Sequence, residues 1–191
     1  MSRPRTFDEE VVVDAAREAF WSRGVHATSI ADLSEATGLS VGSLYKAFGS
    51  KGELCARTLD SYLEAGLDRV EAILTGAASP AVGLQEWLEW IAERASSAGP
   101  TRGCYAVVCA SELAATDASV RRRLVAHDHR LRALVASAIE AANRCGELSG
   151  DPERGARLLC TTVNGVQLDG RKGISRDDAR ATLMLALDAL R

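Results

Sequence analysis

Residues 28–54 read TSIADLSEATGLSVGSLYKAFGSKGEL, and this stretch decides the fold. Its apolar residues recur at three- and four-residue steps, which is the pattern of amphipathic helices. The first helical segment stops at Gly38, and Ser40 is well placed to cap the second segment, residues 41–47. Two short helices joined by so tight a turn predict a helix-turn-helix.

Signals on the amino-terminal side add a further helix to this unit. A Thr6-x-x-Glu9 capping box precedes the amphipathic segment of residues 7–21, and Gly24 closes that segment after a cationic last turn. Thr28 and Ser29 follow, and the hydroxyl of either residue can cap the next helix. We therefore expect a three-helix domain within residues 1–50.

The rest of the chain has helical periodicity and almost no strand-like alternation, so we expect an all-α fold of about nine helices. A Ser50-Lys51-Gly52-Glu53 capping box opens a long helix that connects two domains. Turn-rich breaks separate the later helices, at residues 76–80, 98–103, 146–150 and 169–173. We assign residues 51–191 to a helical-bundle domain.

The composition of the 191 residues, 47% hydrophobic and 26% charged, suits a globular chain with a substantial core. The start of the sequence becomes acidic before an apolar run develops, and no stretch approaches the ~18 apolar residues of a membrane span. We therefore expect a cytoplasmic protein. Its five cysteines are expected to be reduced thiols, and the net charge of −3 does not decide whether it binds DNA.

The quoted stretch resembles the amino-terminal DNA-binding domain of the TetR family of bacterial repressors, and the similarity covers residues 6–56. Its spaced signature is Leu44-Tyr45-x-x-Phe48-x-Ser50-Lys51-x-x-Leu54. The remaining residues resemble the family in length and helical content, and Gly103-Cys104 with residues 111–114 is similar to a thiol-containing subgroup. The resemblance implies a homodimeric repressor that binds a palindromic double-stranded operator and releases it when a small-molecule effector occupies the carboxy-terminal domain. We expect no cofactor.

The amino-terminal end of the second reader helix is expected to contact DNA in the major groove. Gly42 and Ser43 allow the backbone to approach the bases, while Tyr45 and Lys46 can reach bases or phosphates. The charge of Lys51 opposes the helix dipole, which a nearby phosphate would explain, although a solvated lysine also fits. The full set of expected DNA-binding residues is Thr28, Ser40, Val41, Gly42, Ser43, Tyr45, Lys46 and Lys51.

Several of these residues also have a plain structural interpretation. Thr28 and Ser40 can serve only as helix caps, and Tyr45 can be an ordinary half-buried aromatic residue. Arg3 and Arg5 precede the first helix as an arm that either reaches the adjacent minor groove or remains in solvent.

The segments from which the family builds its ligand cavity supply aromatic and polar side chains. The candidate ligand-binding residues are Tyr62, Trp87, Trp90, Cys104, Tyr105, His127, Asn164 and Gln167. Each is individually more typical of core or surface, but ligand cavities combine apolar walls with a few polar groups, which this set provides. Helices expected at 151–169 and 175–190 carry more apolar surface than one subunit covers, so we expect them to form a four-helix dimer interface.

The cysteines leave one alternative mode of regulation open. Cys104, beside Gly103 and near a helix start, is a candidate for redox or electrophile sensing, although a buried inert cysteine is the default. Cys104 and Cys109 would lie about 140° apart and roughly 7.5 Å along a helix axis, so this pair is not expected to form a disulfide. No close His and Cys pair has the spacing of metal ligands, so no metal site is expected.

An enzyme is the alternative from a different class. A helical thiol enzyme would need a cysteine, a base and an orienting group in one cleft, and the sequence gives no sign of this. Glycine-rich phosphate loops, zinc-protease motifs and nucleophile elbows are absent from the sequence. We therefore expect a DNA-binding regulator and not an enzyme. Only the resemblance implies that it represses transcription, and activation stays open.

Overall fold

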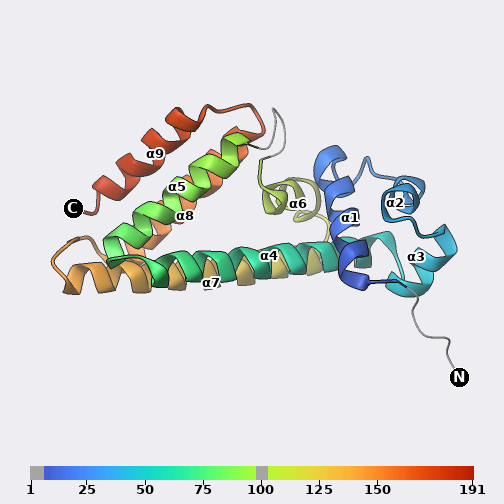
Figure 1. Cartoon of the computed structure of the whole chain (residues 1–191), viewed down its shortest axis with the longest axis horizontal. Coiled ribbons are helices and arrows are strands. Elements are labelled where there is room, and N and C mark those ends of the chain that lie inside the picture. The colour runs from blue at the N-terminus through green and yellow to red at the C-terminus, as the bar shows by residue number, and fades with distance from the viewer. Residues whose placement is uncertain (1–6, 98–102) are drawn as a thin grey trace, which may run out of the picture.

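The computed structural model describes residues 7–97 and 103–191, and within them it consists of helices and short connections (Figure 1). The prediction of an all-α fold is confirmed. The nine helices of this described part are α1 (Glu9–Arg23), α2 (Ile30–Thr37), α3 (Val41–Phe48), α4 (Lys51–Gly76), α5 (Pro80–Ser97), α6 (Tyr105–Leu113), α7 (Ala118–Arg144), α8 (Pro152–Gly170) and α9 (Arg176–Asp188).

The molecule is elongated, with α1, α2 and α3 at one end and α5, α8 and α9 at the other (Figure 1). The long helices α4 and α7 run side by side and join the two ends. The short helix α6 contacts α4, α7 and α8 between these ends. None of the described helices is long and apolar enough to cross a membrane.

The ends of α2 and α3 confirm the local signals of the helix-turn-helix. The Ser29 hydroxyl caps α2 in a reciprocal pair with Asp32, and the Ser40 hydroxyl accepts a hydrogen bond from the N–H of Ser43. Gly38 ends α2 with a φ of 69°, a left-handed conformation that glycine adopts without strain. Local hydrogen bonds therefore fix where both helices begin and end.

The predicted cap of α1 was wrong. The carboxylate of Asp8 accepts hydrogen bonds from the first-turn N–H groups, so the helix begins at Glu9, two residues later than expected. A carboxylate at this position caps as well as a hydroxyl does. Thr6 itself lies outside the described residues, as do Arg3 and Arg5.

Only half of the capping box predicted at the start of α4 is formed. The Ser50 hydroxyl accepts a hydrogen bond of 3.1 Å from the N–H of Glu53. The N–H of Ser50 donates to the carbonyl oxygen of Phe48 at 2.9 Å, and not to the Glu53 carboxylate. The tight connection between α3 and α4 therefore uses the N–H group that a full capping box would need.

One hydrophobic core joins the helix-turn-helix to the middle of the molecule. Phe20, Leu33 and Leu44 are buried in it and come from α1, α2 and α3 respectively. The same core contains Leu59 of α4 and Tyr105 of α6. Because interiors are close-packed, a shift of α4 or α6 changes the packing of the three amino-terminal helices.

A second core holds α5, α7, α8 and α9 together around Trp87, Ile139 and Leu159. Helices α5 and α8 approach each other closely at Gly170. A Cβ added there would lie 2.7 Å from the carbonyl oxygen of Ala95, so the approach requires glycine.

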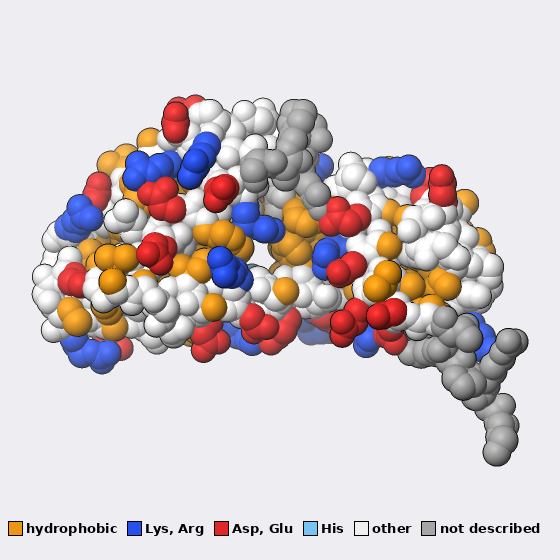
Figure 2. Space-filling model, viewed as in Figure 1, with side chains coloured by type: hydrophobic (Ala, Val, Ile, Leu, Met, Phe, Trp, Pro, Cys, Tyr) orange, Lys and Arg blue, Asp and Glu red, His pale blue; other side chains and the backbone are white. Residues whose placement is uncertain are grey.

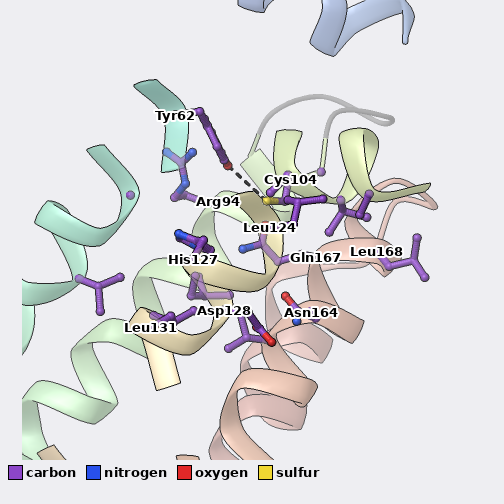
Figure 3. Close-up of a pocket in the computed structure, with 18 of the residues that line it drawn as sticks. Tyr62, Arg94, Cys104, Leu124, His127, Asp128, Leu131, Asn164, Gln167 and Leu168 are labelled. Carbon is purple, nitrogen blue, oxygen red and sulfur yellow. Dashed lines mark hydrogen bonds between the residues drawn. The ribbon is translucent and has the colours of Figure 1, made fainter. Parts of the chain in front are cut away.

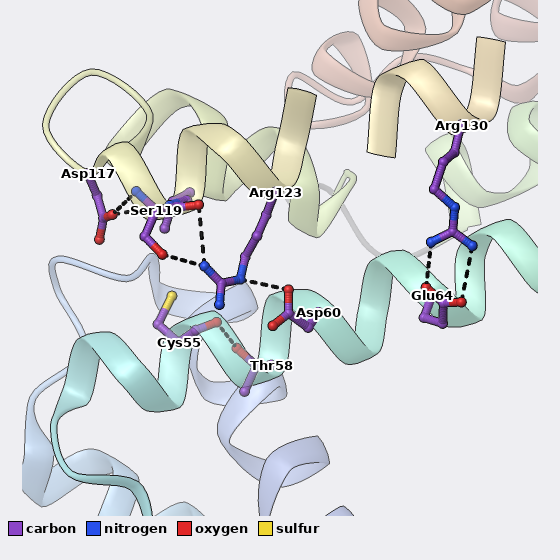
Figure 4. A network of polar contacts seen from close by, with 9 residues as sticks. Cys55, Thr58, Asp60, Glu64, Asp117, Ser119, Arg123 and Arg130 are labelled. Carbon is purple, nitrogen blue, oxygen red and sulfur yellow. Dashed lines mark hydrogen bonds and ion pairs between the residues drawn. The ribbon is translucent and has the colours of Figure 1, made fainter. Parts of the chain in front are cut away.

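Ion pairs connect α7 to α4 along their shared length (Figure 4). Nε of Arg123 lies 2.7 Å from the Asp60 carboxylate, and the Arg130 guanidinium donates to both oxygens of Glu64 at 2.8 and 3.2 Å. Because these pairs are open to solvent, they set the register of the two helices more than they add stability.

Candidate DNA-binding surface and effector cavity

Helix α3 has one buried face and one exposed face. Leu44 and Phe48, one turn apart, are buried against the other amino-terminal helices. The residues on the opposite side are Val41, Gly42, Tyr45 and Lys46, all exposed. The Tyr45 side chain is 48% exposed, and a Cβ added at Gly42 would meet no atom within 4 Å. The exposed face of α3 is therefore slim and unobstructed at Gly42, and it carries the hydroxyl of Tyr45 and the ammonium group of Lys46.

Serine hydroxyls surround the first turn of α3. The Ser40 hydroxyl accepts a hydrogen bond of 3.2 Å from the N–H of Ser43, and the two hydroxyl oxygens lie 2.9 Å apart. A capped helix start still presents amide groups and the positive end of the helix dipole to an approaching anion. The cap and a phosphate contact are therefore compatible at Ser40.

Thr28 does not lie on this surface. Its side chain is fully buried, and its hydroxyl donates a hydrogen bond of 2.7 Å to the carbonyl oxygen of Gly24. The expected direct contact between Thr28 and DNA is thus corrected to a brace within the turn from α1 to α2. Ser29 is exposed and caps α2, so its hydroxyl lies at the surface where we expected that of Thr28.

Lys51, the first residue of α4, is half-buried. Its ammonium group lies 3.5 Å from the carbonyl oxygen of His26 in the turn from α1 to α2. An ammonium group has three donors, so this contact leaves others for a phosphate. The structure therefore gives Lys51 a structural role that the helix-dipole argument did not foresee.

A contact that the sequence analysis missed joins the three-helix domain to α6. The Glu112 carboxylate accepts a hydrogen bond of 2.8 Å from the N–H of His26, and Nε2 of His26 lies 3.0 Å from the carbonyl oxygen of Glu112. Gly24 makes room for this carboxylate, because a Cβ there would lie 2.5 Å from Oε1 of Glu112. We call this set of contacts between Glu112, His26 and Gly24 the α6 latch.

A cavity of about 1160 Å³ lies between the two ends of the molecule, and α1, α4, α5, α6, α7 and α8 form its walls. Figure 2 shows an opening through the middle of the molecule, flanked by hydrophobic side chains and by lysine or arginine side chains. The predicted ligand-binding residues that line the cavity are Tyr62, Trp87, Trp90, Cys104, His127, Asn164 and Gln167. The structure therefore brings seven of the eight candidates together at one cavity.

Tyr105 is the exception, and it does not line the cavity. Its ring is fully buried in the first core, where its hydroxyl oxygen lies 2.8 Å from that of Thr58 and 3.8 Å from Sγ of Cys55. Successive residues on a helix point about 100° apart. Tyr105 therefore faces away from the cavity, although the next residue of α6, Ala106, lines it.

The polar groups of the cavity come from several helices and surround a common space (Figure 3). The Tyr62 hydroxyl lies 3.3 Å from Sγ of Cys104, and burial raises the pKa of Tyr62, so the phenol is neutral. Burial lowers the pKa of His127, so its ring is mostly uncharged at neutral pH. The Arg94 guanidinium lies 5.0 Å from the centroid of the Trp90 ring.

The cationic side chains of this wall were not predicted. Arg17, Arg69 and Arg94 all line the cavity, and nothing in their sequence neighbourhood separates them from surface arginines. Only the packing of α1, α4 and α5 brings them to one space.

Two family models match the chain. The model described as bacterial regulatory proteins, tetR family, matches residues 12–58, and the tetracyclin repressor-like carboxy-terminal domain matches residues 82–186. The chain belongs to the TetR family. The matched residues of this TetR-family regulator include all of α2 and α3 and most of the walls of the cavity.

Relatives over nearly the full length of this TetR-family chain are transcriptional repressors. It is 29% identical to ComR of Escherichia coli strain K12 over 177 residues, which are 91% of this chain and 84% of ComR. It is 27% identical to BdcR of the same strain over 192 residues, 99% of this chain and 92% of BdcR. These relatives are regulators and not enzymes, in agreement with the expectation from the sequence.

Solved structures of TetR-family regulators have the same fold. A cysteine mutant of CifR, complexed with 26-base-pair operator DNA, matches with a TM-score of 0.86 and 30% identity over 100% of both chains. The reduced form of E. coli NemR matches with a TM-score of 0.82 at 20% identity, over 95% of this chain and 94% of NemR.

Proposed function

We propose that this TetR-family regulator is a cytoplasmic homodimeric repressor. Helix α3 of each subunit reads one half of a palindromic operator, and a small molecule in the cavity releases the DNA. The exposed amino-terminal face of α3, on a fold that CifR uses with operator DNA, is the observation that carries this proposal. Residues 1–50 serve as the DNA-binding domain and residues 51–191 as the effector-binding and dimerisation domain.

The proposed DNA contacts follow the chemistry of the exposed face. Gly42 lets the backbone approach the base edges, and Val41 offers apolar contact to a thymine methyl group. Lys46 and the Tyr45 hydroxyl contact phosphates, while the first-turn amides around Ser40 bind the backbone. Ser43 and Lys51 complete the surface, and Ser29 replaces Thr28.

The dimer is proposed to form through α8 and α9, which contact each other. Leu158 and Leu168 of α8 are 41% and 48% exposed, and Leu185 of α9 is 72% exposed. Exposed leucines on two adjacent helices favour burial against the same two helices of a second subunit. A two-fold symmetric dimer matches a palindromic site, with half-sites about one helical turn apart.

Selection of bound duplexes from a random pool with the purified chain tests the proposal. We expect enrichment of a palindrome whose half-sites are about 10 base pairs apart, or a multiple of that distance. A double variant, Tyr45→Ala with Lys46→Ala, serves as the control and should enrich nothing, because the α3 face loses its hydrogen-bonding groups. Failure of the wild-type chain to enrich any sequence at low salt would contradict the proposed function.

One observation favours a second mode of release. Cys104 lines the cavity near the start of α6, where an electrophile that enters the cavity would meet its thiol. Conjugate addition to N-ethylmaleimide would form a carbon–sulfur bond and transfer the thiol proton to the neighbouring carbon. We expect Cys104→Ser to bind operator normally and to resist release by N-ethylmaleimide. Equal release of the variant and the wild type would argue against sensing through Cys104.

A further inference from the structure

The charges that line the cavity are not balanced. Its described wall carries three arginines, Arg17, Arg69 and Arg94, against two carboxylates, Glu18 and Asp128. Both carboxylates already have partners, and that of Asp128 is Arg132. Arg17 pairs with Asp14 at 2.8 Å. Among the residues that the structure describes, neither Arg69 nor Arg94 has a carboxylate within ion-pair distance. Unpaired positive charge beside a partly closed cavity attracts an anionic ligand.

Arg94 is held at the cavity wall by neutral groups. Its guanidinium lies over the Trp90 ring at 5.0 Å and beside Tyr62, whose phenol is neutral (Figure 3). Neither contact neutralises the charge, but both reduce the number of conformations that the long side chain can adopt. A guanidinium positioned in this way binds a carboxylate at a smaller entropic cost than a free surface arginine does.

Other polar groups at the wall also lack partners. Nε1 of Trp87 and Nδ1 of His127 are buried and have no hydrogen-bond partner among the described residues. An indole N–H can only donate, so a partner that reached it would have to be an acceptor. The amide side chains of Asn164 and Gln167 lie at the same cavity (Figure 3).

The rest of the wall is apolar. Ile91, Leu124, Leu131 and Val163 line the cavity together with the ring of Trp90. This surface can bury a hydrocarbon or aromatic body, and it provides most of the binding free energy for ligands of this kind. A small inorganic anion would leave the apolar wall unused.

We infer that the effector is an organic carboxylate with an apolar body, and that its carboxylate pairs with Arg94 while its body packs among the apolar side chains. This inference rests on the proposed function, because it names the ligand class of the same cavity. An organic cation of the same size would face the unpaired charges of Arg69 and Arg94, because the lining carboxylates Glu18 and Asp128 already have partners. A neutral ligand would leave both arginines unpaired.

Calorimetric titration with matched probes tests the ligand class. The probes are 2-naphthoate, 2-naphthamide and 2-naphthylmethylamine, together with octanoate and octylamine. We expect at least one carboxylate to bind at least tenfold more tightly than the amide or amine of the same skeleton. Amines that bind as tightly as the carboxylates, or carboxylates that do not bind, would overturn the inference.

Substitutions then test the role of Arg94. We expect Arg94→Gln to weaken carboxylate binding at least tenfold and to change amide binding less than twofold. Arg94→Lys should retain part of the affinity, because it keeps the charge and loses the bidentate geometry. Arg122→Gln, at an exposed position of α7 outside the cavity wall, is the matched control and should bind like the wild type. Circular dichroism of each variant establishes that it is folded, and equal carboxylate affinity in folded Arg94→Gln and wild type would overturn the inference.

Operator binding by the same preparations, measured without probe, keeps the two proposals separate. A chain that binds its operator and ignores every carboxylate would contradict the ligand class and leave the regulator standing. A chain that binds carboxylates through Arg94 and enriches no operator would contradict the proposed regulator and leave the ligand class standing.

Discussion

Leu44 and Tyr45 are neighbours in the sequence and have opposite environments in the structure. The Leu44 side chain is buried in the core of the three-helix domain, whereas that of Tyr45 is 48% exposed beside Lys46. Truncation of Leu44 would therefore act on folding, at a cost of about 2–5 kcal/mol. We expect changes at Tyr45 or Lys46 to leave the core intact and to act on the proposed DNA contact alone.

Lys46→Gln is the residue-scale test of that separation. We expect operator affinity to fall similarly for all bound sequences, and the slope of log affinity against log salt to become shallower by about one unit. Lys172→Gln, at an exposed position in the turn after α8, is the matched control. An unchanged salt slope in Lys46→Gln would remove this phosphate contact from the proposal.

His127 predicts a pH dependence of stability. Burial lowers its pKa from the ordinary value of 6.5, so just below that pH the unfolded chain binds more protons than the folded chain. The free energy of unfolding therefore rises with pH through this window, and the His127 contribution is lost as the solution becomes more acidic.

We expect the temperature of the unfolding midpoint to decrease as the pH is lowered from about 7 to about 5. The decrease should be smaller in His127→Gln. His129→Gln, at an exposed position on the same helix, is the matched control. The same pH profile in His127→Gln and in the wild type would show that another group causes the dependence.

At the scale of elements, α6 links the two functional regions. Its amino-terminal end carries Cys104 at the cavity, and its carboxy-terminal end carries Glu112 in the α6 latch. The Lys51 ammonium lies near the carbonyl oxygen of His26, so the latched turn contacts both α4 and α6. Because a helix is a stiff rod, displacement of α6 by a ligand would move the turn from α1 to α2.

A double-mutant cycle tests the α6 latch. Glu112→Ala should lower the free energy of unfolding by about 1 kcal/mol, because the N–H of His26 loses its acceptor. Gly24→Ala should cost more than about 1 kcal/mol, because its φ of 91° strains alanine and its Cβ would collide with the Glu112 carboxylate.

The double variant should be more stable than the sum of the single effects, because the collision disappears with the carboxylate. Urea unfolding measures all members of the cycle, and Glu140→Ala on the exposed side of α7 is the control. Strictly additive effects would mean that Glu112 and Gly24 do not interact in solution.

At the scale of the whole molecule, the proposed DNA-binding surface and the proposed dimer interface belong to opposite ends of the elongated chain. Helices α8 and α9, which carry the exposed leucines, lie at the end opposite to α3 (Figure 1). The distance between the two reading helices of a dimer therefore depends on how rigidly α4 and α7 connect these ends. Paired side chains such as Arg130 and Glu64 maintain that register.

Leu185→Glu tests the dimer at this scale. Leu185 is 72% exposed on α9, so a charge there is tolerated by the folded subunit and is costly only inside an interface. We expect a helical monomer by sedimentation, with operator affinity reduced at least a hundredfold because two half-sites no longer bind together. Val11→Glu, at an exposed position on α1 at the opposite end, should remain a dimer. A dimeric Leu185→Glu would place the interface elsewhere.

The sequence alone determined the helices and the helix-turn-helix, and it named seven of the residues that line the cavity. Caps such as Ser40 and stops such as Gly38 act through hydrogen bonds within four residues, and helical periodicity shows which side chains share a face. The tertiary structure decided that Thr28 is buried, that Tyr105 turns away from the cavity, and that Arg94 faces into it. It also decided the contact between Glu112 and His26, which are 86 residues apart. Contacts of this kind depend on the angle and distance at which whole helices pack, which no local signal in the sequence records.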